Sequence, residues 1–403
     1  PWIIGPAFSN GWWHTEKSPK ESIDLLNDCD FIYISHNHSD HLHPPSLDLI
    51  RNDMPILTAN FESNSTTRFL YSLGFNNVIT CDFDKRLIDR DMEVSLSILK
   101  SGDFRDDSGL LIELGEFSTL LNVDSNYIDF WRFPKPLTLL ASTFSGGATG
   151  YPLCFDNFTE DEKRDIVRRN RNSTRATTIS LLTKSEPRYF LPYASFFTEA
   201  ADRDSYIRKN NHKISISDYE SVCTRLGVEL LDVTESRRFV FLGNELTKTS
   251  MPYSEFLHDL SEEMHIRHTK STYDEISRHE IECYFLNSCY KEDLDLVISL
   301  CGDDFDRVFQ RWSVSFRQDG QTSIEWYDDD ITKVEPIQNI QISQTNFLHI
   351  KIRNDSFIRT IREGSPWEDL SIGFQCRIQR HPDVYNSDFW FHFTNVYVRE
   401  AVF

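Results

Sequence analysis

The sequence predicts an α/β sandwich with helices outside two packed β-sheets, followed by a smaller α+β domain. Short apolar runs of strand length alternate with helical stretches through the first half of the chain. The pair Gly115-Glu116 joins two such runs and is typical of a tight β-hairpin. The length of 403 residues is too great for one small core, and an aromatic content of 13% provides material for more than one.

The elements of the first half follow from apolar runs and from residues that begin or end helices. Pro45 starts a short helix, and Gly74 ends the next one. Helices are predicted over 45–51, 65–73 and 160–170. Strands are predicted over 31–35, 55–58, 77–80, 94–99, 110–114, 117–123, 137–141 and 188–192.

The composition shifts between residues 245 and 255, so we expect one domain over 1–250 and a second over 251–403. In the second domain, helices are predicted over 254–265, 273–286, 292–300, 304–309, 345–352 and 357–363, with a closing helix around Trp390, Phe391 and Phe393. Strands are predicted over 313–316, 323–327 and 339–343 and within 369–379. This mixture indicates an α+β domain.

The overall charge and the cysteines restrict the classes of function. The formal net charge of −21 repels phosphate backbones, so we expect no nucleic-acid partner, although a local basic pocket for one anion is compatible with it. No apolar run approaches the length that spans a bilayer. The eight cysteines are scattered without a C-x-x-C pair, which favours reduced thiols in a cytoplasmic protein. The chain opens at Pro1 without a methionine, and we expect an upstream module to be missing or removed.

The most informative motif is a cluster of imidazoles and a carboxylate that follows an apolar run over 31–34. It reads His36-Asn37-His38-Ser39-Asp40-His41 and precedes a helix that begins with prolines. Histidine and aspartate are common ligands of zinc and of non-haem iron. The motif therefore predicts that His36, His38, Asp40 and His41 bind a metal ion; a polar histidine-rich loop is the alternative.

A metal centre needs ligands from more than one loop, and Asp124 is the natural partner because it ends the apolar run 120–123. A strand-terminal turn aspartate is the alternative interpretation. One carboxylate of Asp103, Asp106 or Asp107 is a further candidate. We assign none of the remaining, dispersed histidines to the metal.

A second distinctive segment, 145–152, contains closely spaced glycines whose backbone N–H groups can approach a ligand. An ordinary turn cluster is the alternative. We predict substrate contacts from Gly146, Gly147, Gly150 and Tyr151, and a pocket wall from Trp12 and Trp13.

Several segments carry a resemblance to a known family. They are Pro1-Trp2-Ile3-Ile4-Gly5-Pro6-Ala7-Phe8, Tyr33-Ile34-Ser35-His36, the run 144–152, Pro192-Tyr193-Ala194 and the run 372–380. They resemble the CMP-N-acetylneuraminate hydroxylases, and the histidine motif after an apolar strand resembles the metallo-β-lactamase fold. The segment 313–382 also resembles a sterol-carrier-type fold.

The resemblance implies an αββα core and an iron oxygenase that hydroxylates the N-acetyl methyl group of a CMP-linked sialic acid. It implies that electrons reach the iron through a Rieske [2Fe–2S] cluster. No cysteine–histidine pair of the Rieske type occurs in this chain. The cluster is therefore expected on a separate or missing module, with a Rieske, ferredoxin or cytochrome-type protein as electron donor.

The chain departs from the family at two positions, because Phe104 and the pair Ala200-Ala201 stand where the family has histidines. Two ligands fewer weaken a dinuclear zinc site, whereas two histidines and a carboxylate suit Fe(II) and O₂. The principal hypothesis is an iron monooxygenase that acts on a small nucleotide-sugar or N-acylated molecule. The alternatives are a zinc hydrolase, in which Asp40 orients the nucleophile, and a binding protein with a degenerate site.

Overall fold

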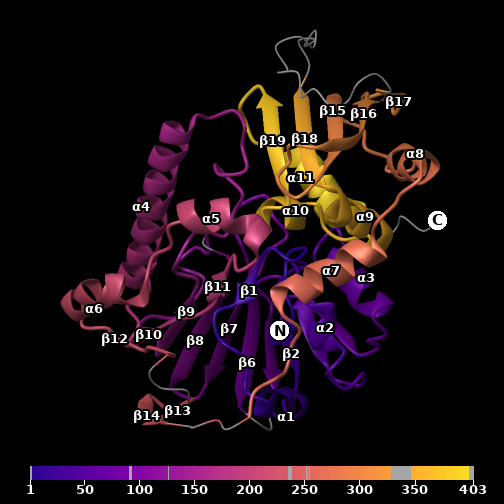
Figure 1. Ribbon diagram of the computed structural model, residues 1–403. Helices are drawn as coiled ribbons and strands as arrows, with labels where there is room; N and C mark the ends of the chain where they lie inside the picture. The colour runs from indigo at the N-terminus through magenta and orange to yellow at the C-terminus, as the bar shows by residue number, and fades with distance from the viewer. Residues whose placement is uncertain are drawn as a thin grey trace.

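The computed structural model describes residues 2–89, 93–125, 127–234, 238–250, 253, 255–327 and 346–398. It confirms the αββα sandwich, and a second layered unit follows it in the C-terminal part of the chain (Figure 1). Among the helices in these ranges, none combines the length and the apolar character needed to cross a bilayer.

The larger sheet of the sandwich has seven strands in the order β12-β10-β9-β8-β7-β6-β5. Strands β8, β9, β10 and β12 run parallel, whereas β5 to β8 are antiparallel neighbours. The strands are β5 (Arg86–Asp89), β6 (Val94–Lys100), β7 (Ser108–Leu114), β8 (Phe117–Val123), β9 (Leu139–Ser142), β10 (Tyr189–Pro192) and β12 (Glu229–Leu230). The carboxyl ends of β8, β9 and β10 therefore lie at one edge, where open α/β sheets bind ligands.

The smaller sheet is parallel throughout and consists of β2 (Ile32–Ile34), β3 (Ile56–Ala59) and β4 (Val78–Cys81). Its inner face packs on the larger sheet through one apolar cluster. Leu57 and Ala59 supply that cluster from β3, and Ile98 and Leu110 supply it from β6 and β7. Burial of this surface against a second sheet holds the two sheets face to face.

Helices cover the outer faces of both sheets. The helices α1 (Glu21–Asn27), α2 (Pro44–Leu47) and α3 (Ser65–Ser72) belong to the small-sheet side, where Leu47, Phe69 and Leu70 pack with Ile32 and Ile34. On the other side, α4 (Glu160–Ser185) and α6 (Glu220–Leu226) place Leu182 and Cys223 against Leu120 and Leu140. The short helix α5 (Ser205–Asn210) links these parts.

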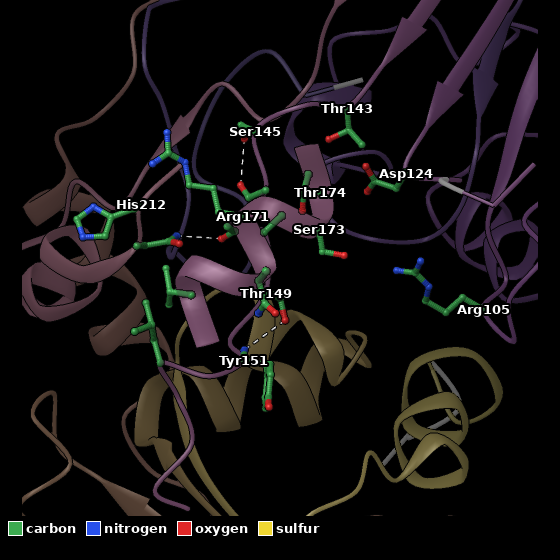
Figure 2. Close-up of a pocket in the computed structure, with 17 residues that line it drawn as sticks. Arg105, Asp124, Thr143, Ser145, Thr149, Tyr151, Arg171, Ser173, Thr174 and His212 are labelled. Carbon is green, nitrogen blue, oxygen red and sulfur yellow. Dashed lines mark hydrogen bonds between the residues drawn. The ribbon is translucent and has the colours of Figure 1, made fainter. Parts of the chain in front are cut away.

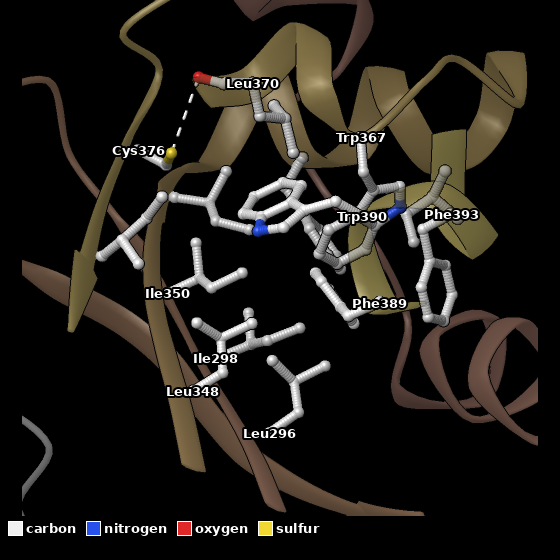
Figure 3. Close-up of a cluster of buried hydrophobic side chains, with 14 of the residues drawn as sticks. Leu296, Ile298, Leu348, Ile350, Trp367, Leu370, Cys376, Phe389, Trp390 and Phe393 are labelled. Carbon is white, nitrogen blue, oxygen red and sulfur yellow. Dashed lines mark hydrogen bonds between the residues drawn. The ribbon is translucent and has the colours of Figure 1, made fainter. Parts of the chain in front are cut away.

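The C-terminal unit contains a five-stranded sheet in the order β17-β16-β15-β18-β19. Its strands are β15 (Leu294–Cys301), β16 (Val308–Phe316), β17 (Thr322–Trp326), β18 (Phe347–Arg353) and β19 (Cys376–His381). Its helices are α7 (Glu262–Thr272), α8 (Arg278–Leu286), α9 (Asn354–Glu363), α10 (Glu368–Ile372) and α11 (Ser387–Phe391), followed by a π-helical turn, His392–Val396. Leu296, Ile298 and Ile350 of the sheet pack on Trp367 and Phe393 (Figure 3).

Two short ribbons complete the architecture. Strand β1 (Trp13–His14) pairs with β11 (Phe197–Thr198), and β13 (Arg238–Leu242) forms a hairpin with β14 (Glu245–Thr249). Because the five-stranded sheet is built entirely from residues beyond 251, we propose that the chain divides near residue 250, as its composition suggested.

Three helix predictions in the C-terminal part are wrong. Residues 294–301 and 347–353, expected within helices, form the adjacent parallel strands β15 and β18. Residues 304–307 form a loop before β16. Continuous apolar runs of this length are compatible with a buried strand or a buried helix, and only the tertiary pairing decides. The helix expected over 254–265 begins instead at Glu262, since the side chain of Ser261 caps it by accepting the N–H of Met264. The strand expected over 339–343 lies outside the described residues.

The sandwich and the C-terminal unit share a core. Phe8 and Trp12 of the N-terminal turn belong to the same buried cluster as Trp367 and Phe374. At the centre of this contact two glycines meet: a Cβ on Gly11 would lie 2.1 Å from the carbonyl oxygen of Gly373. Only glycine permits such an approach of two backbones, which brings α10 against the sandwich.

We predict that Gly11→Ala destabilises the protein by about 1–3 kcal/mol, the usual cost of overpacking, because either backbone must shift. Thermal unfolding of the purified variant measures this loss. Gly302→Ala is the matched control, since a Cβ there would meet its nearest atoms at 3.9 Å. Equal melting temperatures for Gly11→Ala and the control would contradict the close contact.

Candidate metal centre

The histidine motif lies on the loop that follows β2, as the sequence predicted. Side-chain hydroxyls fix the end of that strand: Thr58 Oγ1 donates to the carbonyl of Ile34 at 2.9 Å, and Ser108 Oγ donates to the carbonyl of Ser35 at 2.9 Å. The carbonyl of His38 then accepts the N–H groups of His41 and Leu42 at 3.0 and 2.8 Å. This turn brings the rings of His36 and His41 together, with centroids 4.4 Å apart.

Asp124 reaches the same point from the end of β8. The pairing of β8 with β9 shifts register between Leu121 and Val123, which marks a β-bulge. Val123 has a φ of 53°, a left-handed conformation that is strained for a β-branched residue. The hydroxyl of Tyr193 accepts the N–H of Val123 at 3.1 Å and stabilises this backbone. The bulge therefore directs Asp124 towards the histidines.

Three of the five predicted ligands, His36, His41 and Asp124, offer donor atoms that all lie within 4.8 Å of one another, and His38 and Asp40 each contact one of them. The Nε2 of His36 lies 2.9 Å from Nδ1 of His38 and 4.0 Å from Oδ2 of Asp124. The Nε2 of His41 lies 3.2 Å from Asp40 Oδ2 and 3.3 Å from Asp124 Oδ2. Two ligands of one ion, each at about 2.0–2.2 Å, are at most about 4.4 Å apart. These separations therefore suit a bound cation.

The outward-facing ring nitrogens of two of these histidines contact carboxylates. The Nδ1 of His36 lies 3.2 Å from Asp107 Oδ1 and 2.9 Å from the hydroxyl of Ser35. The Nε2 of His38 lies 3.0 Å from Glu368 Oε2. When each ring donates its outward N–H to its carboxylate, the inward nitrogens carry lone pairs, as in metal sites.

In this proton arrangement two acceptor nitrogens lack a donor, and a cation between them would satisfy both. The lone pairs of His36 and His38 then face each other across 2.9 Å. In addition, Asp40 Oδ1 and His41 Nε2 are buried and form no hydrogen bond with another described residue. Buried polar atoms without partners are costly, and a metal ion would satisfy all of them.

The pKa shifts of the clustered side chains are consistent with metal ligands, which lose a proton when they bind an ion. Burial lowers the pKa of His36, and Asp107 only partly opposes this. Burial also opposes the charged form of His41, yet the carboxylates of Asp40 and Asp124 raise its pKa well above the ordinary value. Burial disfavours a charged Asp124, but His41 holds the pKa of that carboxyl below its usual range. A cation can replace the proton of His41 beside these two carboxylates.

Two adjoining cavities open beside the cluster. The first, of about 350 Å³ and here called the polar cavity, is lined by Arg105, Asp124, Thr143, the 145–149 loop, Arg171, Thr174 and His212 among others (Figure 2). The second, of about 670 Å³ and here called the aromatic cavity, is lined by His38, Phe104, Arg105, Tyr127, Tyr151, Phe155, Glu368, Arg380, Tyr385 and Trp390 among others. Arg105, Thr149 and Tyr151 line both cavities. The metal cluster therefore lies where the two cavities meet.

The predicted substrate residues fall into two groups. Gly146, Gly147 and Tyr151 line the polar cavity, and the carbonyl of Gly147 accepts a hydrogen bond from the side chain of Asn211 at 2.9 Å. Gly150 does not line either cavity and instead packs against Ser371, where a Cβ would meet the backbone oxygen at 2.5 Å.

The expected wall of Trp12 and Trp13 is corrected by the structure. Both side chains are buried, and neither lines the two cavities. Trp12 stacks on Phe197 with centroids 3.5 Å apart and donates its Nε1–H to the carbonyl of Ile372 at 3.1 Å. A large aromatic residue that finds both an apolar neighbour and an acceptor is more stable in the core than at a cavity wall.

The positions without the family's histidines have distinct environments. Phe104 lies on the rim of the aromatic cavity, with its ring 5.6 Å from that of Tyr385, and Ala201 is buried. Of the three aspartates considered as a further carboxylate, Asp107 contacts His36. Glu368 and Arg105 could not be selected from the sequence, because neither belongs to a motif and Glu368 lies far along the chain.

The chain has the αββα layers that its sequence predicts. Its sequence is similar to that of cytidine monophosphate-N-acetylneuraminic acid hydroxylase from Sus scrofa, with 29% identity over 422 residues, which covers 98% of this chain and 92% of the relative. The Macaca mulatta hydroxylase is 28% identical over 98% of this chain and 68% of its own length. The protein called inactive cytidine monophosphate-N-acetylneuraminic acid hydroxylase from Homo sapiens is 28% identical, over 98% of this chain and 80% of its own length. The predicted resemblance to these hydroxylases is therefore confirmed along nearly the whole chain.

Other comparisons are less informative. No family model matches the sequence. A mutant of the CmlA β-hydroxylase is 24% identical over 42% of this chain and 37% of its own, with a TM-score of 0.32. A possible metal-dependent hydrolase from Veillonella parvula is 14% identical, over 61% of this chain and 90% of its own, with a TM-score of 0.35.

We predict that the double variant His36→Ala/His38→Ala loses stoichiometric metal, because it removes one donor of the group His36, His41 and Asp124 together with the neighbouring donor of His38. Elemental mass spectrometry of the purified protein measures metal per chain. The control is His258→Ala/His268→Ala, which alters two exposed histidines. Circular dichroism should show that the C-terminal unit of both variants remains folded. Unchanged metal content in the first variant would refute this site.

Proposed function

We propose that this chain is the catalytic portion of a metal-dependent oxygenase that hydroxylates a small anionic substrate. The observation that carries the proposal is the group of His36, His41 and Asp124, with His38 and Asp40 in contact with it, beside two adjoining cavities. Similarity to named hydroxylases over 98% of the chain supports an oxygenase rather than a hydrolase.

Iron is the metal that this donor set favours for such a reaction, since histidines with carboxylates and open positions are typical of non-haem Fe(II) oxygenases. When bound, iron would activate O₂ for insertion of an oxygen atom into a C–H bond. The balanced reaction consumes substrate, O₂, two electrons and two protons, and yields the hydroxylated product and water. We propose that the electrons come from a Rieske, ferredoxin or cytochrome-type donor.

The residues around the centre would bind and orient the substrate. Arg105 lies between the two cavities, and its polar end points towards the same interior as Asp124 (Figure 2). Its Nε and Nη2 donate to Asp103 Oδ2 at 3.0 and 2.7 Å, whereas Nη1 has no hydrogen-bond partner in the described part of the chain. That N–H group is oriented by the Asp103 pair and can donate to an anionic oxygen.

The character of the two cavities supports a bipartite ligand. Threonines, asparagines and loop glycines line the polar cavity and suit a hydroxyl-rich or amide-bearing group. Phe104, Tyr127 and Tyr151 contribute flat surfaces to the aromatic cavity. A sugar nucleotide of the kind named for the relatives, CMP-N-acetylneuraminic acid, combines a hydroxylated acyl sugar, anionic groups and a base. We propose that a molecule of this class is the substrate.

The decisive test compares iron- and zinc-loaded protein with CMP-N-acetylneuraminic acid, a Rieske-type ferredoxin with its reductase, and NADH. We expect O₂ uptake and transfer of one isotopically labelled oxygen from O₂ into the product only with iron and electrons, measured by an oxygen electrode and mass spectrometry. The His36→Ala/His38→Ala variant serves as the inactive control. Turnover of the zinc form without reductant, with oxygen from water, would establish a hydrolase instead.

We predict that Arg105→Gln raises the KM for the anionic substrate about 10–100-fold, which corresponds to the loss of one hydrogen bond to a charged group. Steady-state kinetics at constant iron content measures this change. Arg105→Lys should retain part of the affinity because it keeps the positive charge but not the oriented fork.

The matched control is Arg188→Gln, which removes a surface arginine paired with Glu245 outside both cavities. It should leave KM unchanged. An Arg105→Gln enzyme with the KM of the unaltered protein would show that the substrate's anionic group binds elsewhere.

A further inference from the structure

We propose that Glu368, contributed by the C-terminal unit, is a positioning residue of the metal centre: it holds the ring of His38 so that Nδ1 faces the other ligands. The proposal rests on the metal centre of the proposed function and extends it to a second part of the chain. Glu368 begins α10, more than three hundred residues after the histidine motif.

The contact between the two side chains is short and largely shielded from solvent. His38 Nε2 lies 3.0 Å from Glu368 Oε2, and the two side chains are 12% and 16% exposed. An exposed ion pair contributes little to stability or orientation, whereas a buried and directional one restricts both partners. His38 has two nitrogens, so occupation of Nε2 by Glu368 leaves Nδ1 as the atom that faces His36 at 2.9 Å.

Glu368 is itself held in place by other groups of the C-terminal unit. Its other oxygen, Oε1, accepts the hydroxyl of Tyr385 at 2.6 Å. Its backbone N–H donates to Thr394 Oγ1 at 3.1 Å. Each carboxylate oxygen thus has a protein partner, His38 or Tyr385. Among the described residues, the group whose donor atoms lie within 4.8 Å of one another is His36, His41 and Asp124, so we infer that Glu368 acts through His38 rather than as a ligand.

The contact repeats an arrangement found on the other side of the cluster. Asp107 of the sandwich faces the outward Nδ1 of His36, and Glu368 faces the outward Nε2 of His38. A carboxylate behind a ligating histidine fixes the ring orientation and raises its basicity as a ligand. The chain supplies one such carboxylate from each of its two parts, so the complete centre requires the C-terminal unit.

The experiment measures Fe(II) and Co(II) affinity of the full chain by competition with a chelator. We expect Glu368→Ala to bind metal about 10–100-fold more weakly, the usual effect of losing such a partner. Glu368→Gln should retain part of the affinity, because its amide oxygen can still accept from Nε2. Tyr385→Phe should weaken binding in the same direction and by less.

Glu363→Gln is the matched control. Glu363 also belongs to the C-terminal unit and accepts a tyrosine hydroxyl, from Tyr273, but its ionic partner is Arg359 rather than a histidine of the cluster. It should leave metal affinity unchanged. The visible absorption bands of the Co(II)-loaded protein give a second readout, which should change in Glu368→Ala and not in the control.

The outcomes separate this proposal from the proposed function. Metal affinity and Co(II) bands in Glu368→Ala equal to those of the unaltered chain would overturn the positioning role while leaving the oxygenase proposal intact. The positioning role would also be overturned if Glu368→Ala bound metal more weakly, kept unchanged Co(II) bands and showed a lower melting temperature of the metal-free protein, because loss of stability would then explain the weaker binding. Tight metal binding that depends on Glu368 without O₂ chemistry would support the positioning role and reject the oxygenase.

Discussion

The structure around the cluster depends on one constraint: several buried lone pairs point at the same small volume. His36 and His38 direct acceptor nitrogens at each other when their outward N–H groups donate to Asp107 and Glu368. Such a cluster repels itself unless protons or a cation lie within it. The bulge at Val123 and the hydroxyl contacts at the end of β2 keep the rings from separating. Local strain and hydrogen bonds thus maintain the close approach of these groups.

The same constraint explains why the two parts of the chain are in such close contact. The Asn37 side-chain amide donates to the carbonyl of Thr394 at 2.8 Å, and the N–H of Phe8 donates to Ser39 Oγ at 2.8 Å. The motif loop is therefore held from outside the sandwich on more than one side. With Gly11 against Gly373, these contacts fix α10 relative to β2. A loosely attached second domain would allow the ring of His38 to rotate, because a single loop provides few contacts to restrain it.

Whether a part of the fold or of the site could be predicted from the sequence depends on how far apart along the chain the interacting residues lie. The histidine motif and Asp124 each follow an apolar run, so local pattern was sufficient to select them. Glu368 was not predictable, because its role comes from a contact between residues 330 positions apart. Trp12 and Trp13 were misplaced, since sequence shows that an aromatic residue will be shielded but not by what. The strands β15 and β18 were mistaken for helices for a similar reason: their pairing partners decide their conformation.

The net charge of −21 does not conflict with an anionic substrate. At physiological ionic strength, exposed charges are screened beyond about 8 Å, so distant acidic residues contribute little inside the cavities. The charges that line the cavity matter more: Arg105 and Arg380 line the aromatic cavity together with Asp103 and Glu368. Asp103 fixes the Arg105 guanidinium and raises its pKa, although burial opposes this. Asp103 accepts hydrogen bonds from two of the five N–H groups of the Arg105 guanidinium and offsets its charge, but it leaves other N–H groups held in a fixed direction. We infer that these cavities select an anion by the direction of the Arg105 N–H groups as well as by their charge.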